Sequence, residues 1–103
     1  MFVKSEPYMN VVHTALTCST SAQEVLGLRA DRKYALLVND SDTVIYAKLA
    51  GTSTGAAAAA TGIRINANGG SYEMASGLGN LWGQWITAMS TTANKVLLIT
   101  EGY

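Results

Sequence analysis

The chain of 103 residues has one cysteine, one proline, one histidine and one phenylalanine. A single cysteine excludes an intrachain disulfide. Charged residues make up 14% of the chain, and seven basic residues balance seven acidic ones. Globular proteins usually carry about 25% charged residues. So little charge, evenly balanced, gives no electrostatic basis for binding nucleic acid or a membrane. A weakly charged surface also does little to keep molecules apart, which indicates a protein that works in contact with other proteins.

Long apolar runs are missing too. No stretch of about 18 apolar residues occurs, so we expect no membrane span. The first ten residues lack a basic segment followed by an apolar core, so we expect no signal peptide and synthesis in a reducing cytoplasm. In that compartment Cys18 is expected to behave as a small buried hydrophobe.

Hydrophobic residues make up 49% of the chain, enough for one modest core in one domain. Residues 34–38 and 44–49 are two apolar runs on either side of a polar turn at 39–42. Valine, isoleucine, tyrosine and leucine fill the runs, and Asn, Asp and Ser fill the break. This pattern predicts a β-hairpin. Both faces of these strands are apolar, which favours the middle of a sandwich or a subunit interface.

Further strands are predicted from alternating side chains at residues 11–19, 63–66, 71–74 and 96–100. In the first of these, Val12, Thr14, Leu16 and Cys18 share one face. Residues 22–28 are ambiguous. Residues 81–90 fit a strand with Trp85, Thr87 and Met89 on one face, or a helix that groups Trp82 with Trp85, Ile86 and Met89. We favour the strand, followed by a hairpin turn at 91–94.

These elements predict an all-β fold, a small β-sandwich or jelly-roll-like barrel of six to eight antiparallel strands. Residues 11–103 would form the single domain. Residues 1–10 would form an N-terminal arm that contacts a partner through Phe2, Pro7, Tyr8 and Met9, or else a first strand on its own domain. Residues 51–62 contain five successive alanines between glycines and predict a loop whose Ala56, Ala58 and Ala60 could lie flat on a neighbour.

Groups for catalysis are sparse. No Gly-x-Ser-x-Gly sequence occurs, and His13, the only histidine, lies in a predicted strand and faces outward. His13 and Cys18 would point to opposite faces about 17 Å apart, so they cannot form a catalytic pair. The oxygens of residues 39–42 could suit calcium, but an ordinary Asx-type turn explains them better. We therefore predict no catalytic residues, metal or cofactor.

Trp82 and Trp85 allow three interpretations. Tryptophans in small β-sandwiches can stack on sugar rings, as in lectins. They can equally lie in the core or at the buried centre of a subunit contact, where tryptophan is enriched. We expect core or contact, and both residues are candidates for partner binding.

The succession of strands and turns over about residues 21–103 resembles a group of small structural proteins of tailed bacteriophages. Three features carry the resemblance: an Arg-x-Tyr-x-Leu-x-x-Asn-Asp-Ser-Asp segment, a Gly-Ile segment with a later Gly-Gly-Ser-Tyr-Glu turn, and a terminal Leu-Leu-x-Thr-Glu-Gly. They match Arg32, Tyr34, Leu36, Asn39, Asp40, Ser41 and Asp42; Gly62, Ile63, Gly69, Gly70, Ser71, Tyr72 and Glu73; and Leu97, Leu98, Thr100, Glu101 and Gly102. The first twenty residues fall outside the pattern.

The resemblance implies a non-enzymatic virion protein, foremost a head decoration or cement protein on the capsid surface, made in the cytoplasm of a bacterial host. Its expected partners are the major capsid protein and copies of itself, as a trimer, with no nucleic acid and no membrane. The alternatives are another virion component, of the neck, tail or fibre base, or a carbohydrate-binding or host-recognition module.

Overall fold

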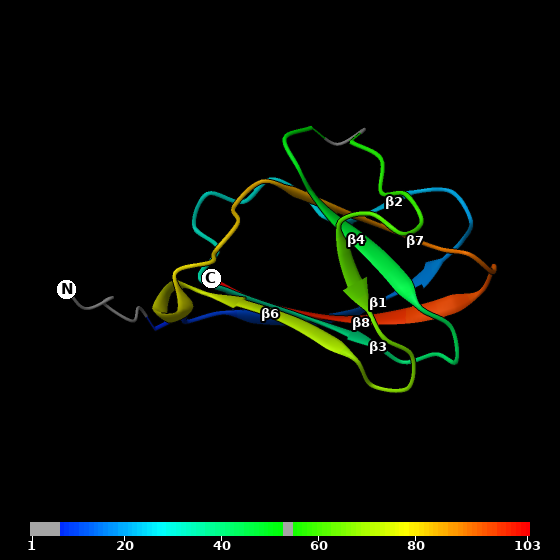
Figure 1. The fold of residues 1–103 in the computed structure, drawn as a ribbon. Coiled ribbons are helices and arrows are strands. Elements are labelled where there is room, and N and C mark those ends of the chain that lie inside the picture. The colour runs from blue at the N-terminus through cyan, green and yellow to red at the C-terminus, as the bar shows by residue number, and fades with distance from the viewer. Residues whose placement is uncertain (1–6, 53–54) are drawn as a thin grey trace.

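The computed structural model describes residues 7–52 and 55–103, which form eight strands and one short 3-10 helix (Figure 1). The elements are β1 (Val11–Cys18), β2 (Gln23–Leu26), β3 (Tyr34–Asn39), β4 (Ile45–Ala50), β5 (Ile63–Ile65), β6 (Ser71–Ala75), η1 (Ser76–Leu78), β7 (Trp85–Ser90) and β8 (Lys95–Gly102).

The strands form two antiparallel sheets of four, and the sheets face each other across the core (Figure 1). The first sheet has the order β1-β8-β3-β6 and the second the order β2-β7-β4-β5. Two four-stranded sheets in this order make a jelly roll. The prediction of a small all-β sandwich or jelly-roll-like fold is confirmed, with eight strands.

The predicted hairpin at residues 34–49 is wrong. Both strands and the turn exist, but β3 pairs with β6 and β8, while β4 pairs with β5 and β7. The turn is an arch that carries the chain from one sheet to the other. Asn39, the last residue of β3, is fully buried and donates from its side-chain amide to the carbonyls of Thr43 and Ile65. These bonds join the arch to β5, so the side chain ties the two sheets together.

The predicted hairpin at residues 85–100 is wrong for the same reason. Residues 91–94 connect β7 of the second sheet to β8 of the first. A polar turn between two apolar runs shows where the chain reverses, but not whether the next strand joins the same sheet. Strands with apolar groups on both faces fit a hairpin within one sheet or a connection between two sheets. Here the connection joins the two sheets.

The core lies between the sheets and consists mainly of aliphatic side chains. Its buried members are Cys18, Ala35, Leu37, Ile45, Ala47, Ile65, Met74, Ile86, Ala88, Leu97 and Ile99. The alternation predicted along residues 63–66 and 71–74 directs Ile63, Ile65, Tyr72 and Met74 inward, and each lies in this cluster or against it. In β1 only Cys18 is buried and Leu16 is partly buried against the core, and the first half of the strand is exposed on both faces.

Candidate functional site

The groups considered for catalysis lie apart. His13 is exposed, and its Nδ1 lies 2.9 Å from the Thr100 hydroxyl. Cys18 is buried, and burial raises the pKa of its thiol to about 11, so it stays protonated and a poor nucleophile near neutral pH. Within residues 7–52 and 55–103, no three His, Cys, Asp or Glu side chains gather to hold a metal, and no helix is long and apolar enough to cross a membrane.

The most extensive candidate contact surface is the outer face of the first sheet. Side chains that alternate with the buried Ala35, Leu37 and Leu97 point away from the second sheet. They are Val11, His13, Ala15 and Thr17 of β1; Val96, Leu98 and Thr100 of β8; Tyr34, Leu36 and Val38 of β3; and Ser71 and Glu73 of β6. Val11 is 48% and Leu98 40% exposed. Among these side chains the only acidic or basic one besides the histidine is Glu73.

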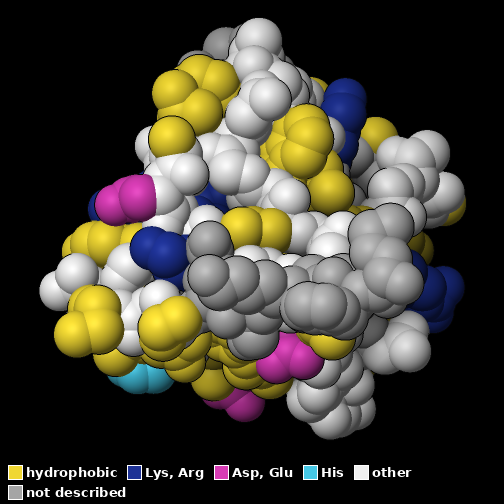
Figure 2. Space-filling view, turned by 90° about the vertical axis from the view of Figure 1, so that its left-hand side faces the viewer, with side chains coloured by type: hydrophobic (Ala, Val, Ile, Leu, Met, Phe, Trp, Pro, Cys, Tyr) yellow, Lys and Arg dark blue, Asp and Glu magenta, His cyan; other side chains and the backbone are white. Residues whose placement is uncertain are grey.

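Figure 2 views the end of the molecule at the left of Figure 1, and hydrophobic side chains gather at its lower left. Glu73, the one carboxylate among the outward side chains of β1, β8, β3 and β6, accepts a 2.6 Å hydrogen bond from the Tyr34 hydroxyl. That bond, more than burial, raises the pKa of Tyr34 to about 12. The outward side chains of these four strands thus include one carboxylate and no lysine or arginine, and few charges at the centre are typical of protein contact surfaces.

Residues 7–10 of the predicted arm lie on the chain's own domain. The amides of Met9 and Asn10 donate to the carbonyl of Tyr103, and the amide of Tyr103 donates to Asn10. The ring of Tyr8 stacks on Tyr34 with 5.5 Å between centroids. It lies on the backbone of Gly102, where any Cβ would come within 2.6 Å of the ring. All four residues are exposed, and Phe2 lies outside the described residues.

Part of the alanine loop packs on the outer face of the second sheet at Thr87. Ala57 is buried, and the Thr87 hydroxyl of β7 donates 2.7 Å to the carbonyl of Gly55, which fixes the loop to the sheet. Ala56, Ala58 and Ala60 are exposed. Their contact with a neighbour stays a prediction.

The two tryptophans face different surroundings. Trp82 packs against the core cluster and donates from Nε1 to the carbonyl of Trp85 at 2.9 Å. Trp85 is half-buried on the outer face of β7, where it pairs with Ala50. The prediction that Trp85, Thr87 and Met89 share a face is confirmed by the register against β4. The rings are therefore not arranged as a pair on one surface.

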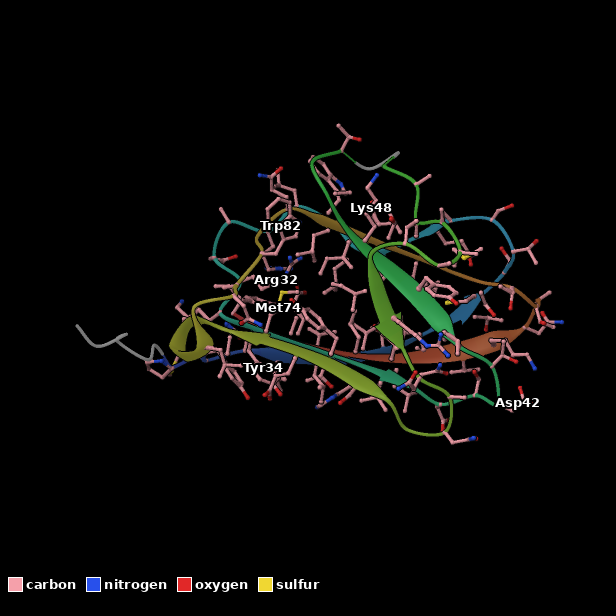
Figure 3. The ribbon with its side chains drawn as sticks, in the orientation of Figure 1. Arg32, Tyr34, Asp42, Lys48, Met74 and Trp82 are labelled. Carbon is pink, nitrogen blue, oxygen red and sulfur yellow. The ribbon has the colours of Figure 1, made fainter. Side chains whose placement is uncertain are left out.

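A buried ion cluster, which the sequence analysis did not anticipate, closes one end of the sandwich. Arg32 is 2% exposed, and its Nε lies 2.7 Å from Glu101 (Figure 3). Its remaining nitrogens donate to the carbonyls of Gly27, Trp82 and Gln84. Arg29 adds a second contact to Glu101 at 3.4 Å. The sequence alone does not show that Glu101, near the end of β8, lies beside Arg32.

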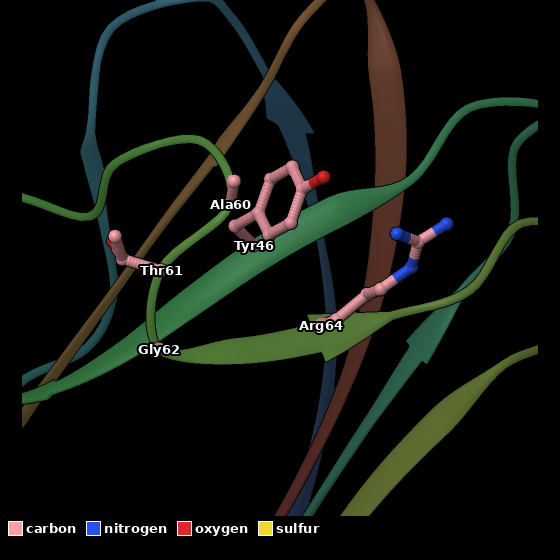
Figure 4. Close-up of a pocket in the computed structure, with 5 residues that line it drawn as sticks. All are labelled: Tyr46, Ala60, Thr61, Gly62 and Arg64. Atoms are coloured by element: carbon pink, nitrogen blue, oxygen red, sulfur yellow. The ribbon is translucent and has the colours of Figure 1, made fainter.

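A shallow hollow on the second sheet was also not anticipated. Its volume is about 190 Å³, and Tyr46, Ala60, Thr61, Gly62 and Arg64 line it (Figure 4). Tyr46 and Arg64 are paired across β4 and β5, so their side chains leave the sheet on the same side. Ligand pockets usually exceed about 300 Å³, so this hollow suits at most one small group.

The polar turn at residues 39–42 is occupied by internal bonds. The Ser41 hydroxyl donates to Asn39 Oδ1 and accepts from the amide of Thr43. Asp42 lies 2.6 Å from Lys95, at the end of the molecule opposite Arg32 (Figure 3). The ion pair holds the pKa of Asp42 below its usual value. The observed contacts are those of a structural turn.

Comparisons of this chain with family models, with curated proteins and with solved structures found no match.

Proposed function

We propose that this protein is a structural component of a tailed-phage virion, foremost a head decoration or cement protein that clamps neighbouring capsid subunits. The observation that carries the proposal is the outer face of the first sheet, where exposed valine and leucine stand on a surface with almost no charge. Such a face loses little on desolvation when another protein covers it. The jelly roll itself recurs in viral capsid proteins, although it also occurs in lectins.

The clamping action follows from burial repeated over a lattice. Burying apolar area contributes roughly 25 cal/mol per Å², so a small footprint gains several kcal/mol before the entropic cost of docking. A protein bound across the junction of two capsid subunits adds this binding free energy at the place where the shell would break. Many such contacts on one particle act together, so weak single contacts suffice.

The contact segments proposed for the capsid are the exposed residues Pro7, Tyr8 and Met9 and the alanine loop with Ala56, Ala58 and Ala60. Tyr8 packs against β3 of the first sheet and the alanine loop against β7 of the second, so one molecule could touch two neighbours. The proposed partners are the major capsid protein and further copies of this chain, with the capsid surface as its location. The trimer implied by the resemblance stays a prediction.

The test is co-sedimentation of the purified protein with heads of the encoding phage that lack it. We expect saturable binding, and we expect Ala56→Glu/Ala58→Glu/Ala60→Glu to weaken it at least tenfold, because three carboxylates would be desolvated at the contact. Thr91→Glu/Thr92→Glu/Ala93→Glu is the matched control, since it adds the same charge to another exposed loop. Failure of the wild-type protein to bind heads contradicts the proposal. Labelling on whole particles then distinguishes a neck, tail or fibre-base position.

A saccharide-binding role is the second candidate, and the hollow beside Tyr46 and Arg64 favours it. An aromatic ring next to a guanidinium suits an acidic sugar. Glycan-array binding that Tyr46→Ala abolishes would support this role. Equal binding by wild type and Tyr46→Ala, or none by either, would count against it.

A further inference from the structure

The four edge strands of the two sheets differ in how they are protected against pairing with other chains. β2 has four residues and a register irregularity between Glu24 and Leu26. β5 has three residues, with the exposed Arg64 at its centre. Short, bulged or charged edges pair poorly with other strands.

The fourth strand of the first sheet, β6, is protected by a side chain. Asn80 donates from Nδ2 to the carbonyl of Glu73 and accepts at Oδ1 from the amide of Ala75. These two bonds occupy backbone groups on the side of β6 away from β3, as a neighbouring strand would. The amide side chain therefore closes this edge.

The edge at β1 has none of these protections. β1 is eight residues long, pairs with β8 over its whole length without a bulge, and contains no proline, lysine, arginine, aspartate or glutamate. In the described part of the chain no strand pairs with its other edge. Val11 and Val12 point to opposite faces and are 48% and 40% exposed, because the second sheet does not cover this half of the strand. A long, regular, uncharged edge is the kind that pairs with another strand.

We propose that the β1 edge binds the β1 edge of a second copy of this chain, in antiparallel register about a two-fold axis. An antiparallel copy presents the same alternation of N–H and C=O groups, so the edge complements itself. With no lysine, arginine, aspartate or glutamate on β1, no charge opposes the approach. The two first sheets then form one continuous sheet of eight strands, and exposed Val11 and Val12 gain neighbours. The inference rests on the self-association in the proposed function, and it gives a two-fold pair where the resemblance implies a trimer.

The expected strength follows from the size of the edge. A strand of eight residues is about 27 Å long and buries a few hundred Å² per copy, below the roughly 800 Å² per partner of a stable complex. The pair is therefore a reversible dimer in solution. On a particle, the two copies of such a dimer would also be held by their contacts with the capsid.

In an antiparallel pair about a two-fold axis, the residue on the axis faces the same residue of the other copy. The largest number of β1 residues pair when that residue is Thr14 or Ala15. The variant Ala15→Lys/Thr17→Lys places like charges across this axis, on exposed positions of the outer face. Its matched control is Thr92→Lys/Ala93→Lys, which makes the same two changes on an exposed loop. Circular dichroism and tryptophan fluorescence establish that both variants fold.

The experiment is sedimentation equilibrium of the full chain from about 1 µM to about 1 mM. We expect the wild-type mass to rise from 10.8 kDa toward twice that value. The β1 variant should dimerise at least tenfold more weakly, and the control like wild type. Three results would overturn the proposal. The wild-type protein stays monomeric at all concentrations, or its mass reaches that of three chains, or the β1 variant dimerises as tightly as the control.

Hydrogen exchange of the wild-type protein tests the contact without any substitution. The amides of Val11–Cys18 that point away from β8 should exchange more slowly as concentration rises, while those bonded to β8 should not change. Exchange that is independent of concentration in a dimeric protein overturns the β1 contact. Neither experiment uses a capsid, so failure here leaves the proposed virion role untouched, and head co-sedimentation tests that role separately.

Discussion

Among single residues, Arg32 has the largest expected effect on stability. It is buried, and it satisfies Glu101 together with three carbonyls from two loops. Arg32→Met should lower the free energy of unfolding by about 3–5 kcal/mol, because it leaves the buried Glu101 carboxylate with only its 3.4 Å contact to Arg29 and three carbonyls without their donor. Urea denaturation measures this loss. Arg64→Met, at an exposed arginine, should change stability by no more than about 0.5 kcal/mol. Similar losses for both variants would refute the structural role of the cluster.

Tyr34 gives a prediction on pH. Its pKa in the folded protein, about 12, lies above the ordinary value of 10.0, so the folded state holds this proton more tightly than the unfolded chain. The resulting stabilisation is complete below pH 10 and is lost as the pH rises through about 12. Wild-type stability should therefore fall more steeply between pH 10 and 12 than that of Tyr34→Phe.

Absorbance at 295 nm follows the same ionisation directly. Tyr34→Phe should remove a step near pH 12 from the titration, whereas Tyr46→Phe should leave that step in place. If instead Tyr34→Phe removes a step near pH 10, the hydrogen bond to Glu73 does not hold the proton as described.

Strands and turns differ in how far the sequence determines them. Most strand positions were predictable, because alternation and β-branched residues mark them locally. Residues 22–28, which contain β2, gave no clear pattern. Their partners were not. The turns at residues 39–42 and 91–94 have the composition of hairpin turns, yet both cross between sheets. The bonds that favour the arch join Asn39 to Ile65 of a distant strand, and no local pattern encodes such a contact.

The alanine loop shows the same dependence on a distant residue. Its exposed alanines were predictable, but its attachment to β7 through Thr87 and Gly55 was not. Thr87→Val keeps the side-chain shape and removes the buried donor, so it should lower the free energy of unfolding by about 1–2 kcal/mol.

Thr61→Val is the matched control for that loop. Thr61 also donates to a loop carbonyl, that of Ala58, but in an exposed position where water replaces the bond. Chemical denaturation should show a change within about 0.5 kcal/mol for this variant. Equal effects of the two substitutions would mean that the loop does not depend on its bond to the sheet.

For the protein as a whole, composition and alternation were enough to predict an all-β sandwich, because eight short strands with polar turns allow few other folds. The candidate contact surfaces were only partly accessible to sequence reasoning. Tyr8 and the exposed alanines were identified, but the outer face of the first sheet depends on which strands are neighbours. The buried Arg32 cluster and the open edge at β1 likewise depend on that strand order.

The virion role is tested by heating phage heads that lack this protein, with and without added protein, and recording the temperature at which they release DNA. If the protein clamps capsid subunits, saturating wild-type protein should bind the heads and raise the release temperature. The variant Ala56→Glu/Ala58→Glu/Ala60→Glu should raise it less. An unchanged release temperature at saturating, bound protein would contradict the cement role, and absence of binding would contradict a place on the head altogether.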